Sequence, residues 1–238
     1  MLEQAHSSAD AAPLPRWPWF AGVLVFLVLA TTRIDLHVAG LFHTEEEAWF
    51  LGEHWLPATL YDYGPYVAIL IAVGSAIVLL GRRWVAEEAR ESTVRLAWIM
   101  LMTLVLGSGL IVNTVLKPNV GRARPRNVEE FGGPKGGFQP VFSLDHHRTG
   151  TSFPSGHAST GFYLATPYFP LRRRRRGLAR FALGTGLFAG CLMGAGRIVQ
   201  GGHYLADVFT SGLIMLGTAA LVTRWFERRA GSQGEGGS

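Results

Sequence analysis

Residues 96–125 read LAWIMLMTLVLGSGLIVNTVLKPNVGRARP, an apolar run that ends in a group of basic residues and prolines. A helix that crosses a membrane needs about 20 mostly apolar residues, and residues 96–116 contain no charged side chain. The remainder, residues 117–125, is rich in positive charge and in helix-breaking residues. The stretch therefore predicts a membrane-spanning helix that carries a cationic segment to one face of the membrane.

Five more apolar stretches extend this prediction to an all-α, integral-membrane bundle of six transmembrane helices. We expect the spans at residues 17–38, 64–80, 96–116, 154–171, 178–196 and 205–226. Hydrophobic residues make up 48% of the 238 residues and charged residues only 16%, against ~25% in soluble domains. One domain is expected over residues 1–230, followed by a flexible Gly/Ser-rich tail at residues 231–238. The first apolar run lacks the basic flank and cleavage site of a signal peptide, so none is expected.

The net charge of +5 indicates membrane orientation rather than nucleic-acid binding, because the basic residues gather at the ends of apolar stretches. Arginine clusters follow the second, fourth and sixth predicted spans, at residues 82–95, 172–180 and 224–229. Cytoplasmic loops are enriched in Lys and Arg, so both termini are expected in the cytoplasm. The single cysteine, Cys191, excludes an intrachain disulfide.

A fourth basic group departs from this orientation rule. Its members lie in the polar loop 117–153, which the same topology places on the external face: Lys117, Arg122, Arg124, Arg126, Lys135 and Arg148. Positive charge on that face is disfavoured unless a function requires it, so we expect the functional site there. Within the group, Arg122 and Arg126 either line the site or contact lipid headgroups.

The link between the first two spans, residues 44–63, has Trp, Phe and Leu residues among acidic ones. This spacing is typical of a short helix at the membrane interface, and an ordinary loop is the alternative. Trp55, Tyr61 and Tyr63 are candidates to border the path by which a lipid reaches the site.

Three segments far apart in the chain converge on the external face in this topology. They are residues 117–125, 154–157 and 197–207. Lys117, Arg124 and Arg197 would supply fixed positive charge there, and a guanidinium group can bind phosphate oxygens through two parallel hydrogen bonds. The convergence predicts an anion site.

The start of the fourth predicted span adds uncharged donors to this site. Pro154 suits a first helical turn, where its missing N–H costs little. Ser155 and Gly156 would then present a hydroxyl and free backbone N–H groups to a phosphate. Gly156 also allows close approach of the backbone to the anion.

Two histidines divide the acid–base chemistry. His203 and Asp207 are four residues apart, so on a helix they share one face. Asp207 can accept a hydrogen bond from one imidazole nitrogen of His203 and leave the other as a nucleophile. His157 arrives from another span and is the candidate general acid for the leaving oxygen. In a second step, water would attack the phosphohistidine with His157 as base.

Two other patterns have plainer interpretations. Asp145, His146 and His147 are adjacent, but neighbouring histidines in a loop without a further suitably spaced ligand are typical of solvated residues. No metal site is therefore expected. Ser155 lacks the G-x-S-x-G turn of a nucleophilic serine, so it is not expected to attack the substrate.

The three segments together resemble the type 2 phosphatidic acid phosphatase superfamily, whose motifs read K-x6-R-P, P-S-G-H and S-R-x5-H-x3-D. Residues 117–125, 154–157 and 197–207 match them in order and spacing. The one departure is Gly196, where the family usually has serine, which removes one possible phosphate or helix-capping contact. The resemblance implies a six-helix bundle, a phosphohistidine intermediate and no metal or other cofactor.

The flanking sequence narrows the resemblance to the bacterial lipid A phosphatases of the inner membrane. The stretches that carry it are residues 34–42, 129–138 and 197–203. They imply removal of the 1- or 4′-phosphate of lipid A at the periplasmic face of the inner membrane. The expected partners are a phosphorylated lipid and the bilayer, and the oligomeric state is left open.

Other functions are compatible with the same basic loop. A phosphatase acting on undecaprenyl diphosphate or phosphatidylglycerophosphate, or a lipid phosphotransferase, would differ only in leaving group or acceptor. A transporter of anionic lipid would use the basic residues as a binding site. Transport does not require a nucleophilic histidine aligned by an aspartate, so the pair His203 and Asp207 favours an enzyme.

Overall fold

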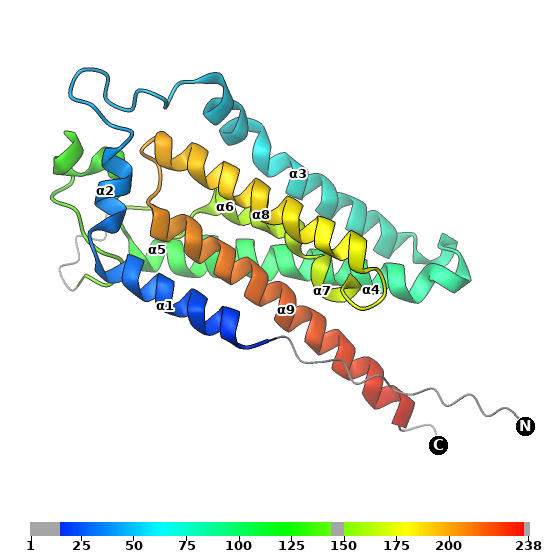
Figure 1. Ribbon diagram of the computed structural model, residues 1–238. Helices are drawn as coiled ribbons and strands as arrows, with labels where there is room; N and C mark the ends of the chain where they lie inside the picture. Colours follow the sequence, from blue (N-terminus) through cyan, green and yellow to red (C-terminus); the bar gives the residue numbers. More distant parts are fainter. Residues whose placement is uncertain (1–14, 144–149, 236–238) are drawn as a thin grey trace, which may run out of the picture.

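The computed structural model describes residues 15–143 and 150–235, and that part of the chain is helical, as the apolar stretches predict. Over these residues it forms no strand, and extended pairing is limited to an isolated bridge between Thr44 and Ala48. In Figure 1 the long helices lie side by side in an elongated bundle, with connecting loops gathered at its two ends.

The helices differ widely in length. In chain order they are α1 (Trp17–Thr31), α2 (Ile34–Gly40), α3 (Trp55–Leu80), η1 (Arg82–Trp84), α4 (Glu87–Thr103), η2 (Leu104–Leu116), α5 (Lys117–Val120), η3 (Pro125–Asn127), η4 (Glu129–Phe131), α6 (Gly156–Phe162), η5 (Tyr163–Ala165), α7 (Tyr168–Leu171), α8 (Arg176–Val199) and α9 (Leu205–Glu235). Four helical stretches are long and apolar enough to cross a membrane: Trp55–Leu80, Glu87–Phe131, Arg176–Val199 and Leu205–Ala230. The pair α1 and α2 makes a fifth if it is taken as one bent span. Six spans therefore stay a prediction.

The first predicted span, residues 17–38, is not one straight helix. α1 ends at Thr31, and α2 leaves it at an angle of 74°. The bend turns Asp35 into the protein, where its side chain is completely buried. A buried carboxylate needs partners, and the partners of Asp35 explain why the chain bends here.

The second long helix begins earlier than predicted. α3 starts at Trp55 rather than at residue 64, because His54 caps it by accepting a hydrogen bond from the N–H of Leu56 (3.4 Å) and Pro65 is accommodated inside the helix. The separate interfacial helix expected within residues 44–63 is therefore wrong. The C-terminal half of residues 44–63 is the first part of α3, and the N-terminal half forms turns.

The expected fourth span, residues 154–171, is divided into the short helices α6, η5 and α7 rather than forming one continuous helix. α6 begins after its capping residue Ser155, so Pro154 precedes the helix instead of occupying its first turn. The segment packs closely on α8, because a Cβ at Gly161 would lie 2.7 Å from the Cα of Gly190. Such backbone contact requires small residues, and it places the C-terminal end of α6 against α8.

η2 continues α4 as a π-helix. In this winding each N–H bonds to the carbonyl five residues earlier, so residues five apart line up on one face. The side-chain amide of Asn113 donates to the carbonyl of Ser108 (2.8 Å), and the hydroxyls of Ser108 and Ser159 share a hydrogen bond (2.8 Å). A polar face of η2 therefore faces α6 and leads toward Lys117.

Members of two of the three predicted arginine clusters lie together at the end of the bundle away from Lys117. Arg95, Arg173, Arg174 and Glu227 line one hollow, which joins the ends of α4, α7 and α9. α9 continues to Glu235, so residues 231–235 of the predicted flexible tail are helical, whereas residues 236–238 lie outside the described residues.

Candidate active site

One end of the bundle brings the three predicted segments together. Lys117 begins α5, Ser155 caps α6, and Arg197 lies in the last turn of α8. His203 lies in the turn between α8 and α9, and Asp207 lies in the first turn of α9. The N–H of Ser155 donates to the carbonyl of Asp207 (3.1 Å), which ties the start of α6 to α9.

His203 lies beside Asp207, although it precedes α9 instead of sharing a helical face with the aspartate as predicted. Its side chain is 2% exposed, and its Nδ1 lies 3.5 Å from Oδ2 of Asp207. The separation exceeds that of a strong hydrogen bond, but catalytic hydrogen bonds are often long in a free site and tighten when substrate binds. Burial lowers the pKa of His203, while Asp207 acts in the opposite direction. The imidazole is therefore neutral near pH 7. A nucleophilic role for its Nε2 stays a prediction.

Asp207 is itself completely buried and held by several donors. The hydroxyl of Ser152 (2.5 Å) and the backbone N–H of Tyr204 (2.8 Å) both donate to Oδ2. Nη1 of Arg122 donates to Oδ1 at 2.8 Å. These contacts satisfy both carboxylate oxygens and fix the orientation of Asp207 toward His203.

Arg122 also holds a second carboxylate. Its Nη2 lies 2.8 Å from Oδ2 of Asp35, whose Oδ1 accepts a hydrogen bond from the N–H of Ala206 (2.8 Å). The guanidinium carbon lies 4.0 Å from the ring centroid of Tyr204, a favourable cation–π contact. Neither role predicted for Arg122 is therefore correct: it is a buried counter-ion between two aspartates. We call Asp35, Arg122 and Asp207 the buried triad.

Lys117, Arg124 and Arg197 form a contrasting group, which we call the cationic cluster. Among the residues that the structure describes, no carboxylate lies within 4.0 Å of these side chains. Lys117 donates to the side chain of Asn113 (3.1 Å), and Arg124 donates to that of Thr151 (3.2 Å). The buried Nε atoms of Arg124 and Arg197 have no hydrogen-bond partner in the described part of the chain. Spare donors on positive groups suit an anionic ligand.

Arg197 is buried and held from two sides. Its Nη1 donates to the side-chain oxygen of Gln200, and its guanidinium carbon lies 4.5 Å from the ring centroid of Tyr61. A Cβ at Gly202 would lie 2.2 Å from Nη2 of Arg197. Glycine at this position therefore leaves the room that the guanidinium occupies.

Ser155 and Gly156 have structural roles at the start of α6. The buried hydroxyl of Ser155 accepts a hydrogen bond from the N–H of Ala158 (3.3 Å) and so caps the helix. A Cβ at Gly156 would lie 2.8 Å from Oδ1 of Asn113 and 3.2 Å from Nζ of Lys117. Gly156 thus allows the lysine to pass close to α6. Contact of either residue with a phosphate stays a prediction.

Gly196 lies on the side of α8 that faces α3. A Cβ there would lie 3.6 Å from Leu60 and 3.7 Å from Pro57. Together with these residues, Gly196 lines an apolar groove. A serine side chain at this position would point toward that groove, so the departure from the family pattern is accommodated by packing against α3.

His157 lies in the first turn of α6, and its ring stacks on Tyr61 with centroids 4.6 Å apart. Burial lowers the pKa of His157 to about 4, and the charges of Arg197, His203 and Lys117 act in the same direction. The imidazole is therefore neutral at pH 7 in the free site. A bound phosphate dianion would oppose these positive charges and raise the pKa, which suits a general acid.

Several contact residues were not predicted as parts of the site. They are Asp35, Asn113, Ser152 and Gln200. A carboxylate inside an apolar stretch is a signal for Asp35, and an amide four residues before Lys117 is a signal for Asn113. Ser152 and Gln200 carry no such signal, because their partners depend on how the loops fold.

Four loop residues considered in the sequence lie outside the described residues. They are Asp145, His146, His147 and Arg148. Over residues 15–143 and 150–235, no group of three or more His, Cys, Asp or Glu side chains is arranged to hold a metal ion. The absence of a metal from the reaction stays a prediction.

Comparison with known families matches residues 96–230 to the PAP2 superfamily. A protein named Lipid A 4'-phosphatase from Francisella tularensis subsp. novicida (strain U112) is 29% identical over 205 residues, which cover 82% of this chain and 86% of the relative. A protein of the same name from Rhizobium etli is 27% identical over 227 residues, covering 87% and 84%. The family match includes every segment of the site from α5 onward.

A solved structure is similar in fold. It is the crystal structure of the first transmembrane PAP2 type phosphatidylglycerolphosphate phosphatase from Bacillus subtilis, with a TM-score of 0.51 and 17% sequence identity. The match covers 88% of this chain and 96% of that one. At this identity the likeness shows a common helical architecture.

Proposed function

This chain belongs to the PAP2 superfamily, and we propose that it removes a phosphate from a membrane lipid through a phosphohistidine intermediate on His203. The proposal depends on one juxtaposition. A buried neutral imidazole, oriented by Asp207, lies beside a cationic cluster without carboxylate partners in the described part of the chain. A lipid transporter would use the cations, but it would have no need of the oriented nucleophile.

In the first step, Nε2 of His203 attacks phosphorus, and a P–N bond forms as the P–O bond to the lipid breaks. Asp207 stabilises the positive charge that develops on the imidazole by accepting a hydrogen bond from Nδ1. The cationic cluster binds the non-bridging oxygens and stabilises the charge of the transition state. His157, protonated in the substrate complex, donates its proton to the leaving lipid oxygen.

In the second step, water attacks the phosphohistidine and the P–N bond breaks. His157, now neutral, accepts the proton of the attacking water, and inorganic phosphate is released. The electron pair of the P–N bond returns to His203, which restores the starting state. All charge stabilisation in this scheme comes from side chains, so we propose that no metal ion takes part.

The printed names of the relatives support a glycolipid substrate, with the 4′-phosphate of lipid A preferred. The arginine-rich end of the bundle supports an inner-membrane protein with cytoplasmic termini and a periplasmic site. In this topology the bent pair α1 and α2 and the segment from α6 to α7 complete six crossings. Phosphatidylglycerophosphate and isoprenoid diphosphates are the alternative substrates.

The test is phosphate release from a panel of phosphorylated lipids by the purified protein. We expect release to persist in excess EDTA, to be inhibited by vanadate, and to fall at least ~10³-fold in His203→Ala because the nucleophile is lost. His37→Ala, which changes an exposed histidine, is the matched control. Loss of turnover in EDTA that a divalent metal restores would overturn the metal-free scheme. Near-normal activity of His203→Ala would overturn the nucleophile.

A further inference from the structure

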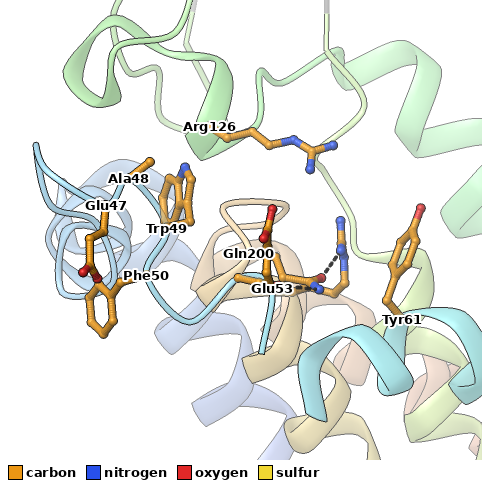
Figure 2. A pocket seen from close by; sticks show the side chains of 10 residues that line it. Glu47, Ala48, Trp49, Phe50, Glu53, Tyr61, Arg126 and Gln200 are labelled. Atoms are coloured by element: carbon orange, nitrogen blue, oxygen red, sulfur yellow. Dashed lines mark hydrogen bonds between the residues drawn. The ribbon is translucent and has the colours of Figure 1, made fainter. Parts of the chain in front are cut away.

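A cavity of about 510 Å³ lies directly beside the proposed phosphate site. It shares Arg197 and Tyr61 with that site. Figure 2 shows Arg126 reaching over the cavity, with Trp49 on one side and Tyr61 on the other. The volume falls within the ~300–1,000 Å³ that is typical of sites for small molecules. If Arg197 holds the phosphate, this space is therefore open to the part of the substrate to which the phosphate is attached.

The loop that carries Trp49 is held in place by specific contacts. The side-chain amide of Gln200 donates to the carbonyl of Gly52 (3.2 Å). The indole of Trp49 packs on Gly201, where a Cβ would lie 2.2 Å from the ring, and its centroid lies 5.2 Å from that of Phe131. The cavity wall is therefore built by packing and hydrogen bonds, as a binding site requires.

The lining residues combine aromatic side chains with hydrogen-bonding groups of both charges, namely two carboxylates, two guanidinium groups and one amide. Trp49 contributes an aromatic ring against which the C–H groups of a sugar can pack, whereas the ring of Tyr61 is already covered by His157 and Arg197. Glu47 and Glu53 accept hydrogen bonds from hydroxyl groups, and Gln200 both donates and accepts. With Arg197 engaged by the scissile phosphate, two carboxylates and Arg126 remain in the lining, and this net negative charge disfavours a second phosphate. The charged side chains also disfavour an acyl chain.

We propose that this cavity binds the sugar unit to which the scissile phosphate is attached. The inference rests on the proposed phosphatase function and assigns the sugar of the glycolipid to a cavity that diacylglycerol phosphates would leave unfilled. Gln200 links the two sites, because it lines the cavity and accepts a hydrogen bond from Arg197. A sugar in contact with Gln200 would therefore help to hold Arg197 in position for the phosphate.

The experiment compares two substrates with matched acyl chains, an acylated glucosamine phosphate and phosphatidic acid. Glu47→Ala combined with Glu53→Ala should lower the ratio of kcat/KM for the glycolipid to kcat/KM for phosphatidic acid about tenfold or more. The reason is that hydrogen bonds to charged groups contribute roughly 1.5–3 kcal/mol. Glu46→Ala, an exposed acid of the same loop that does not line the cavity, should leave the ratio unchanged. Soluble glucosamine phosphate should also inhibit more strongly than glycerol phosphate, and the double variant should erase that difference.

The outcomes separate the two proposals. An unchanged ratio in the double variant, with normal hydrolysis of both lipids, would overturn the sugar site and leave the phosphatase function standing. Equal losses on both lipids would also overturn it, because they would indicate a general structural effect. If the unsubstituted protein released phosphate from no lipid in the panel, the phosphatase function itself would fail.

Discussion

Arg122 and Arg124 stand two residues apart in one loop, and the fold gives them opposite surroundings. Arg122 lies between Asp35 and Asp207, with a nitrogen 2.8 Å from each. Arg124 is half-buried, bonds to Thr151, and meets no carboxylate within 4.0 Å in the described part of the chain. The same type of side chain is thus a structural counter-ion in the buried triad and a proposed phosphate-binding group in the cationic cluster.

The difference is energetic as well as geometric. A buried charge without a partner costs several kcal/mol, so the triad stabilises the fold only while all its members are present. The cationic cluster instead holds like charges together without compensating acids, a local cost that a bound anion relieves. Stability should therefore depend on the triad, and turnover on the cluster. Four experiments test whether stability depends on the buried triad and turnover on the cationic cluster.

The largest effect is expected from Arg122→Met, which removes the charge that the two aspartates share. It leaves Asp35 and Asp207 without their counter-ion, so we expect a loss of about 3–5 kcal/mol of stability together with loss of activity. Thermal unfolding in detergent would measure it. Arg126→Met, an exposed change in the same loop, should leave stability unaltered. Normal stability of Arg122→Met would contradict a structural role for this arginine.

Arg124→Ala should have the opposite signature. One donor to the transferring phosphoryl group is lost, so kcat/KM should fall roughly 10²–10³-fold, as when a donor to a developing oxyanion is removed. The unfolding temperature should stay the same or rise, because the cluster loses one like charge. Steady-state kinetics and thermal unfolding on the same preparation would check both. A lower unfolding temperature of Arg124→Ala would show that Arg124 stabilises the fold, as the members of the buried triad do.

Asp35→Asn tests the member of the buried triad that does not contact His203. The amide keeps the acceptor for the N–H of Ala206 but loses the charge that faces Arg122, so we expect a loss of about 1–3 kcal/mol. Arg122 still pairs with Asp207, so the activity loss should be smaller than for Arg122→Met. Combining the two substitutions in a double-mutant cycle would measure their coupling. Strictly additive effects would show that the two side chains act independently.

The smallest effect concerns the pH at which His157 titrates in the free protein. With a pKa of about 4, its imidazole stays neutral and reactive toward diethyl pyrocarbonate well below the ordinary histidine value of ~6.5. Peptide mass spectrometry should therefore show half-maximal modification near pH 4. Arg197→Gln should move this midpoint to higher pH, because a positive neighbour is removed. A midpoint at the ordinary value would show that burial and the cluster do not act on His157.

Local sequence spacing was sufficient to select the residues proposed to carry the chemistry. His203 and Asp207 are only four residues apart, so they stay close even though His203 precedes α9. Charge at the end of an apolar run likewise marked Lys117 and Arg124. These predictions depend on short-range geometry, which side-chain type and period determine.

The boundaries of the helices were less predictable. Hydropathy began the second span at residue 64 and predicted the fourth as one helix, but capping by His54 and packing of Gly161 on α8 gave other limits. The π-helical winding of η2 also changes which residues share a face. In each case a tertiary contact or a local hydrogen bond outweighed the apolar periodicity.

The sequence by itself determined a helical membrane protein with a histidine, an aspartate and basic residues on one face, because apolar length, charge clustering and motif spacing are local properties. Only the tertiary structure decided that Arg122 binds two aspartates, one of them 85 residues away along the chain, while Arg124 stays open to a ligand. It also placed a polar cavity beside Arg197 from a loop more than a hundred residues distant, since Gln200 and Gly52 meet across 148 residues. Burial and pairing of charge depend on which segments fold together, and no local pattern encodes that.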